Sequence, residues 1–208
     1  MAGKKRKVQT QDILTKDELL LKINSMPSLR DRALACFIYL SGCRISEIVG
    51  CKKRVRNKNK LTKEVTFEEP ITIKPMTKEN IEVITEKNLM LIHNVACLKR
   101  RKEIPRRVIP IAIREEWTFC DIFLQYYNTL SPGAYLFPIT RERAWQIMNT
   151  IKIFNHFLIH QRCHWLVVRE NFNPLDLKQF RGWSNTKPAE IYTHLSYQDL
   201  ARKMGAKP

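Results

Sequence analysis

Two short segments of the chain, about 150 residues apart, carry side chains that could act together on a phosphodiester. Arg44 lies in the first segment, and its guanidinium would stay charged and match two phosphate oxygens at once. Tyr192 lies in the second segment, and its hydroxyl could form a covalent bond to phosphorus. A phenol is a poor nucleophile at its free pKa of about 10. Such chemistry therefore needs cations that stabilise the developing negative charge and a group that protonates the leaving oxygen.

The residues around Arg44 and Tyr192 resemble two sequence boxes of the tyrosine recombinases. Residues 39–48 read Tyr-Leu-Ser-Gly-Cys-Arg-Ile-Ser-Glu-Ile, which is similar to the family's first-arginine box: a helix, a glycine turn and then Arg-(Ile/Val)-Ser-Glu. Residues 181–183, Arg-Gly-Trp, are followed nine residues later by Ile-Tyr-Thr-His at 191–194, which resembles the nucleophile segment. The two boxes occur in the family's order and at its separation. The resemblance covers roughly residues 13–200 and implies cleavage and rejoining of DNA through a 3′-phosphotyrosine intermediate, with no metal and no cofactor.

The resemblance implies a role for each polar residue of these boxes. Arg44 would clamp the scissile phosphate, and Glu47, one turn further on, would orient Arg44 through an ion pair. Trp183 follows Gly182, where family members carry His or Trp, and would donate its indole N–H to the phosphate. The plainer alternatives are a surface arginine, an exposed helix carboxylate and a core tryptophan with a satisfied N–H.

The general acid that the resemblance implies is a lysine at the tip of a β-hairpin. Lys99 occupies the similar position here and would protonate the leaving 5′-oxygen, because a lysine desolvated beside other cations gives up its proton more readily. Lys102 is a rival. The run of cations that also includes Arg100 and Arg101 could equally be a surface that contacts phosphates.

The clearest departure from the family lies at residues 156–160, His-Phe-Leu-Ile-His, which stand where members have His-x-x-Arg-His. His156 would contact the scissile phosphate, but Ile159 replaces the second arginine and cannot pair with a phosphate. Arg162, three residues later on nearly the same helical face, is a candidate stand-in. Alternatively, the protein is naturally degenerate, or residue 159 was altered to block chemistry. We expect a site that is impaired.

Composition independently favours nucleic acid as the partner. The 208 residues include 37 Lys and Arg against 20 Asp and Glu, which gives a formal net charge of +17 and a pI near 9.8. Such an excess destabilises a soluble domain by self-repulsion, and nucleic-acid binding is the first function that it suggests. Seven Lys and Arg lie between residues 51 and 63. The DNA-contacting residues that we expect are Lys52, Lys53, Arg54, Arg100, Arg101 and Lys102.

Several classes of protein are disfavoured by the same reading. No apolar run approaches the roughly 20 residues of a membrane helix, and the first residues lack the apolar core of a secretory signal. The six cysteines are scattered singly, without the clustered spacing of a zinc site. We therefore expect reduced cysteines, no bound metal, and a cytoplasmic, nucleoid-associated protein, or a nuclear one only in a eukaryotic host.

Helices should dominate the fold. Capping signals and apolar periodicity predict helices over 15–26, 28–41, 117–130, 141–153, 156–169 and 174–182, and another that carries Tyr192. Extended segments are expected at 71–74, 89–95 and 107–113, the last two forming a hairpin with a basic tip, while 51–63 reads as a loop. The predicted class is mixed α/β, mostly helical, with a small antiparallel sheet: the tyrosine recombinase catalytic-domain fold.

The expected organisation is a basic arm over 1–13, a catalytic domain over 14–200 and a C-terminal tail over 201–208, with no N-terminal core-binding domain. The partner would be double-stranded DNA. The resemblance implies a homotetramer on two DNA sites, with the chain a monomer when free, and its variant boxes look archaeal or like those of mobile elements. The alternative function is a catalytically degenerate DNA-binding protein on the same fold.

Overall fold

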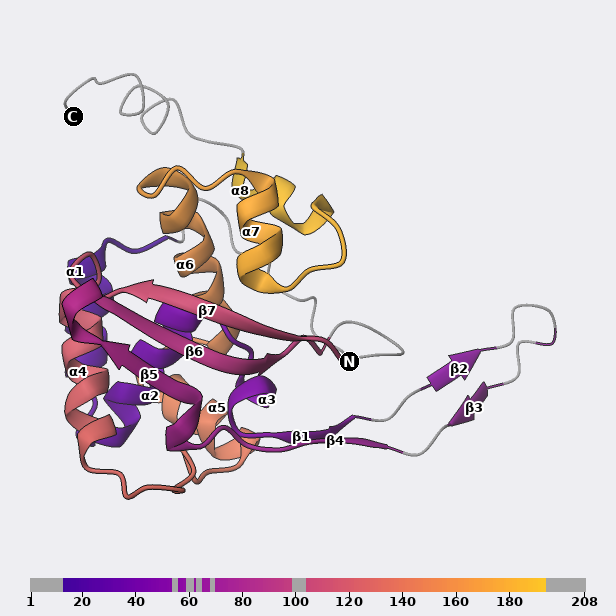
Figure 1. Ribbon diagram of the computed structural model, residues 1–208, viewed down its shortest axis with the longest axis horizontal. Coiled ribbons are helices and arrows are strands. Elements are labelled where there is room, and N and C mark those ends of the chain that lie inside the picture. Colours follow the sequence, from indigo (N-terminus) through magenta and orange to yellow (C-terminus); the bar gives the residue numbers. More distant parts are fainter. Residues whose placement is uncertain are drawn as a thin grey trace.

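The computed structural model describes residues 13–53, 56–58, 62, 65–67, 70–98 and 104–193. Its helices and strands, in chain order, are α1 (Lys16–Asn24), α2 (Leu29–Ser41), α3 (Ile45–Ile48), β1 (Cys51–Lys53), β2 (Arg56–Lys58), β3 (Val65–Phe67), β4 (Ile71–Ile73), η2 (Lys78–Asn80), β5 (Ile81–Ile84), η3 (Thr85–Lys87), β6 (Leu89–Ala96), β7 (Arg106–Ala112), α4 (Trp117–Asn128), α5 (Arg141–Thr150), α6 (Asn155–Val168), α7 (Pro174–Arg181), η4 (Lys187–Ala189) and α8 (Glu190–Thr193). Figure 1 shows the three-stranded sheet β5–β6–β7 crossing the molecule, with α6, α7 and α8 on one side of it. The mixed, mostly helical class with antiparallel sheets is confirmed.

Helix α2 is the centre of the hydrophobic core. Every residue from Ala33 to Ser41 is buried, as the apolar run predicts, and the helix packs against both α4 and α6. Phe37 contacts Phe123 of α4, with ring centroids 4.9 Å apart. Because a helix buried on all sides cannot tilt without opening cavities, α2 gives the turn that follows it a fixed position.

The sheet β5–β6–β7 is antiparallel throughout, with β6 in the middle. Ile92 of β6 lies opposite both Ile81 of β5 and Ile109 of β7, so one face of the sheet presents a row of isoleucines to the core. The predicted hairpin is confirmed as β6 and β7. The sequence analysis predicts no strand at β5. This strand has four residues, and only the apolar residues at its two ends are buried or half-buried, so it shows little of the apolar pattern that indicates a strand.

The prediction of a loop over 51–63 is wrong. Strands β1 and β2 lie within it and pair antiparallel with β4 and β3, respectively. In Figure 1 the β1–β4 pair extends away from the body of the molecule, and β2 and β3 lie further out in the same direction. The pairing partners are supplied by residues 65–73, so the strands depend on contacts that the charged run does not contain. A run rich in Lys and Arg can form a ladder because backbone groups, not side chains, make its hydrogen bonds.

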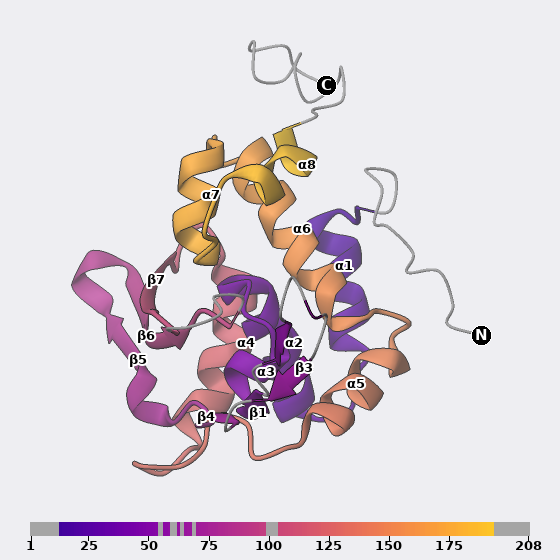
Figure 2. The ribbon, with the colours of Figure 1, turned by 90° about the vertical axis from the view of Figure 1, so that its right-hand side faces the viewer.

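The C-terminal helices begin and end where local signals place them. Helix α7 begins after Asn173, whose side chain accepts hydrogen bonds from the backbone N–H of Leu175 and Asp176, and it ends at Gly182 with φ of +63°. The chain then turns through η4 into α8, which carries Tyr192. Figure 2 shows α7 and α8 packed at one end of α6. These three helices bring the second sequence box against the turn after α2.

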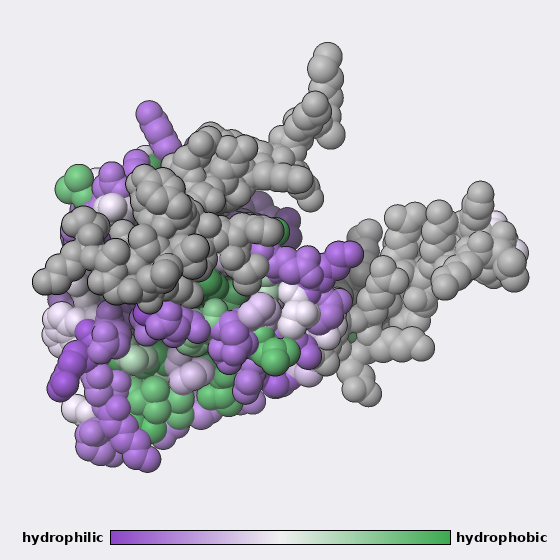
Figure 3. Space-filling model, turned by 90° about the horizontal axis from the view of Figure 1, so that it is seen from above, coloured by the Kyte–Doolittle hydropathy of each residue, from purple (hydrophilic) through white to green (hydrophobic). Residues whose placement is uncertain are grey.

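In the described part of the chain, no helix is long and apolar enough to cross a membrane, and no three or more side chains cluster in a way suited to hold a metal ion. All six cysteines are free, and all except Cys51 are buried. Seen from above, hydrophilic residues surround patches of hydrophobic ones (Figure 3).

Candidate active site

The turn between α2 and α3 fixes Arg44. Helix α2 ends at Gly42, whose φ of +58° is a left-handed conformation that suits glycine. Arg44 then caps α3, and Glu47 holds it twice: one carboxylate oxygen accepts from the Arg44 backbone N–H at 2.9 Å, and the other accepts from the guanidinium Nη1 at 2.8 Å. The Glu47 side chain is fully buried, while that of Arg44 is 20% exposed. The guanidinium is therefore oriented and still reachable from solvent.

Two further arginines converge on the same carboxylate region. Arg107 of β7 approaches Glu47 at 3.6 Å, and its Nη1 lies 3.2 Å from the sulfur of Cys97. Arg181 comes from the last turn of α7 and is 2% exposed. Burial lowers the pKa of Arg181, and Arg44 and Arg107 lower it further, against the opposing effects of Cys163 and Glu47. Three guanidinium groups thus lie around one buried carboxylate, and only those of Arg44 and Arg107 are within ion-pair distance of it, so the cluster carries excess positive charge.

Tyr192 lies beside this arginine cluster and is 8% exposed. Its ring stacks on that of Trp183, with an interplanar angle of 10° and centroids 6.4 Å apart. Burial raises the pKa of the Tyr192 hydroxyl, and the neighbouring Cys163 raises it further, whereas Arg181 acts in the opposite direction. The resting hydroxyl is therefore a neutral phenol, which needs a base before it can react.

A base is within reach of that phenol. Nδ1 of His160 lies 2.6 Å from the Tyr192 hydroxyl oxygen. Burial lowers the pKa of His160, and Arg181 lowers it further, so the imidazole is neutral at pH 7 and Nδ1 can accept the proton. His156, one turn earlier on α6, makes an edge contact with the His160 ring at 4.8 Å between centroids.

The sequence pattern did not single out His160, Arg107 or Arg181. A signal for His160 exists, because His156, Ile159, His160 and Cys163 are spaced to share one face of α6. Arg107 carries no comparable signal, and Arg181 stands in the Arg-Gly-Trp box without a role assigned to it. Each is one basic residue among many in a chain with 37 Lys and Arg.

Ile159 and Arg162 have different surroundings. Ile159 is 2% exposed and belongs to the hydrophobic core. Arg162 is also buried, but its guanidinium forms an ion pair with Glu116 and lies over the ring of Tyr39. The positive charge of Arg162 is therefore matched by Glu116, a carboxylate that also pairs with Lys16.

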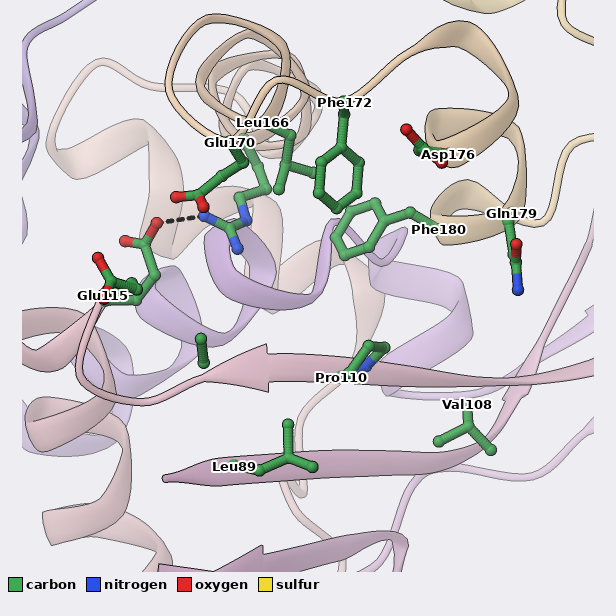
Figure 4. A pocket seen from close by; sticks show the side chains of 13 residues that line it. Leu89, Val108, Pro110, Glu115, Leu166, Glu170, Phe172, Asp176, Gln179 and Phe180 are labelled. Atoms are coloured by element: carbon green, nitrogen blue, oxygen red, sulfur yellow. Dashed lines mark hydrogen bonds and ion pairs between the residues drawn. The ribbon is translucent and has the colours of Figure 1, made fainter. Parts of the chain in front are cut away.

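The Arg162–Glu116 pair borders a cavity of about 570 Å³ between α6, α7 and β7. Figure 4 shows Leu166, Phe172 and Phe180 along one side and Val108 and Pro110 of β7 along the other, and its dashed line marks the ion pair. Neither His160 nor Tyr192 lines this cavity. The cavity is thus separate from the Tyr192–His160 pair.

Several predicted residues fall outside the part of the chain that can be described. The proposed general acids Lys99 and Lys102, together with Arg100 and Arg101, lie in the gap at 99–103, and Arg54 lies in the gap at 54–55. Lys52 is exposed on β1, and Lys53 follows it in the same strand. The hairpin strands do place the ends of the 99–103 gap near the site, since Cys97 contacts the guanidinium of Arg107.

Comparison with known proteins identifies the fold. No protein-family model matches the chain, and no curated protein matches it in sequence. Among solved structures, the XerH site-specific recombinase bound to a palindromic difH substrate is similar with a TM-score of 0.56 and 17% identity, over 93% of this chain and 52% of that one. The XerA recombinase gives 0.56 and 15%, over 98% and 67%. The catalytic domain of bacteriophage HP1 integrase gives 0.52 and 16%, over 92% and 93%.

The share of each solved structure that this chain matches differs between the structures. The chain spans about half the length of the XerH structure, whereas it matches nearly all of the isolated HP1 integrase catalytic domain. The similarity thus falls on the unit that carries the arginine turn, the hairpin and the tyrosine helix. This chain has the catalytic-domain fold of the tyrosine recombinases.

Proposed function

We propose that the chain is a site-specific DNA recombinase or integrase that cuts and rejoins DNA through a 3′-phosphotyrosine intermediate. The observation that carries the proposal is the Tyr192 hydroxyl, held 2.6 Å from His160 beside a cluster of three arginines. Transfer of a phosphoryl group to a tyrosine hydroxyl requires a nucleophile, a base and a cationic site for the phosphate. Structures with the same fold include recombinases and an integrase.

The proposed reaction needs no external energy source. As the Tyr192 oxygen forms its bond to phosphorus, its proton passes to Nδ1 of His160, and the bond from phosphorus to the 5′-oxygen breaks. Arg44 stabilises the charge on the nonbridging oxygens, and Glu47 fixes the orientation of the Arg44 guanidinium. The 5′-oxygen leaves as a hydroxyl after protonation, the role that we assign to Lys99, with Lys102 as its rival. The phosphotyrosine keeps the bond energy for the reverse attack by a 5′-hydroxyl.

The remaining assignments follow from the same proposal. His156 and Trp183 would contact the phosphate, and the cations at 52–54 and 100–102 would hold the duplex. The net charge of +17 supports DNA as the partner. We propose a homotetramer on two DNA sites, with the protein associated with the nucleoid.

A covalent-adduct assay on DNA of random sequence tests this function. The chain is incubated with 5′-labelled duplexes that contain a single nick between randomised flanks. The short 5′-hydroxyl fragment released next to the nick diffuses away, so the protein stays attached. We expect label on the denatured protein, and its loss in Tyr192→Phe, which keeps the ring stacked on Trp183. Sequencing the attached DNA then supplies a defined substrate.

A second candidate function rests on Ile159. Isoleucine at this position withholds a guanidinium that the resemblance leads us to expect, which favours a DNA-binding protein without cleavage activity. The same assay separates the two functions, because a binding protein shifts the duplexes in a native gel and leaves no adduct after denaturation.

A further inference from the structure

We propose that Arg181 is a catalytic residue that supplies the second guanidinium to the scissile phosphate, from α7 instead of α6. This assignment rests on the proposed function. It replaces the expectation of an impaired site, because the site would have its second arginine, delivered from another helix. Four observations carry the assignment, namely the missing counter-ion of Arg181, its unpartnered donors, its neighbours and the glycine against which it lies.

Arg181 differs from the other buried arginines around the site in its charge balance. Arg44 and Arg107 both approach Glu47, and Arg162 pairs with Glu116. Among the described residues, no carboxylate lies within ion-pair distance of Arg181, which is 2% exposed. A buried cation without a counter-ion is strongly unfavourable unless an anion binds beside it.

Arg181 also has two buried guanidinium nitrogens without a hydrogen-bond partner, whereas Arg107 and Arg162 have one each. The two nitrogens of Arg181 are Nε and Nη1. Buried donors of this kind are rare in folded proteins and often signal a ligand or a catalytic role. A phosphate beside either edge of the guanidinium could accept from one of these two donors.

Arg181 lies close to the groups that would react. Its guanidinium carbon lies 5.8 Å from the centre of the Trp183 ring, and Trp183 stacks on Tyr192. Its charge lowers the pKa values of both Tyr192 and His160. Cys163, on the same face of α6 as Ile159, feels the charge as well. The positive charge of Arg181 therefore acts on the face of α6 where isoleucine stands in place of the expected arginine.

Gly42 makes room for this arrangement. A Cβ atom built on Gly42 would lie 3.2 Å from Nη1 of Arg181 and 2.9 Å from the Phe180 ring. The turn that presents Arg44 thus lies directly against the Arg181 side chain. The two guanidinium groups are held by adjoining elements, as a clamp on one phosphate requires.

The test compares adduct formation by four proteins on the duplex that the randomised pool yields. Arg181→Met removes the charge at similar length, Ile159→Arg/Arg181→Met moves the guanidinium to α6, and Arg169→Met is a control. Arg169 is exposed at the end of α6, over the Trp165 ring. We expect Arg181→Met to slow adduct formation by about 10²- to 10³-fold. The double variant should recover part of that loss, and Arg169→Met should match the unaltered chain.

A substrate with a methylphosphonate at the scissile position separates catalysis from folding. A methyl group replaces one charged oxygen there, so a clamp that only neutralises charge becomes less important. Arg181→Met should therefore regain most of its rate relative to the unaltered chain on this substrate. Its thermal unfolding temperature should be unchanged or higher, because an unpaired buried charge has been removed.

The outcomes distinguish this assignment from the proposed function. Should the unaltered chain form a Tyr192-dependent adduct at the same rate as Arg181→Met, the assignment fails and the function stands. Equal losses on phosphate and methylphosphonate, together with a lower unfolding temperature, would reduce Arg181 to a structural residue. An unaltered chain that forms no adduct overturns the function and this assignment together.

Discussion

The hydroxyl of Tyr192 and Nδ1 of His160 lie 2.6 Å apart, although 32 residues separate them in the chain. The contact joins the helix that carries Tyr192 to the helix that carries His156 and His160. It occurs where burial keeps the phenol protonated and the imidazole neutral. In the reaction that we propose, this pair transfers one proton, from oxygen to nitrogen.

The first prediction is a pH dependence that originates at His160. Its pKa lies below the ordinary value of 6.5, so the base is neutral at pH 7 and becomes protonated only as the pH falls through that lowered pKa. Adduct formation should decline on the acid side of that point. His160→Asn should slow it by about 10²- to 10⁴-fold and remove this acid limb. His93→Asn, which alters a half-buried histidine paired with Glu82, is the matched control.

Stability should follow the same histidine. Because the folded pKa is lowered, the unfolded chain binds more protons below pH 6.5, so His160 weakens folding as the pH falls through that window. Thermal unfolding of the unaltered chain and His160→Asn at pH 7 and pH 5 measures this. An equal loss of stability in both proteins on acidification would contradict the buried, neutral imidazole.

The second prediction assigns Arg162 a structural role. Glu116→Leu leaves the buried Arg162 without its carboxylate and should lower the free energy of unfolding by about 3–5 kcal/mol. Arg162→Met should be less damaging, because Lys16 still faces Glu116 at 3.0 Å. Chemical denaturation of the two variants measures the difference.

The adduct rate of Arg162→Met, measured per folded molecule, completes this test. It should equal that of the unaltered chain, because the charge of Arg162 is already matched by Glu116. A large fall in rate without a fall in stability would instead make Arg162 the stand-in for the arginine that Ile159 replaces.

The third prediction concerns the charge of Glu47. Glu47→Gln keeps an oxygen that can accept the Arg44 backbone N–H but removes the carboxylate that faces the arginines. The variant should unfold at a lower temperature, and added inorganic phosphate should stabilise it more than it stabilises the unaltered chain. The control is Glu18→Gln, which alters the corresponding, exposed capping residue of helix α1. A phosphate effect of the same size in both variants would argue against an anion site at the arginines.

The fourth prediction is a steep salt dependence of DNA binding. If roughly six phosphates are contacted, affinity should fall about 10³-fold between about 50 and 200 mM salt. Exchanging Lys52 for Gln should make the slope shallower by about one unit if that exposed side chain contacts a phosphate. Binding measured by fluorescence anisotropy over a salt series decides this, and a flat response would remove DNA as the partner.

Much of the fold is determined by local sequence. The helices begin at residues such as Thr15 and Asn173, whose side chains cap backbone N–H groups within the next three residues. Helices α2 and α7 end at Gly42 and Gly182, which adopt left-handed conformations. Such signals involve a few neighbouring residues, so they are visible in the sequence without tertiary contacts. For the same reason Arg44 and Tyr192 stand out in short boxes of the sequence.

What only the tertiary structure decided are the contacts between distant elements. Strand β1 exists because residues 71–73 pair with it, and that partner is invisible within the charged run. Arg181 reads as one more cation until α7 places it, buried and without an ion-pair partner, against Gly42 of the turn after α2. Arg162 lies one helical turn beyond Ile159, yet it forms an ion pair with Glu116. The energy of a buried charge depends on which groups surround it, and packing across the whole chain sets those groups.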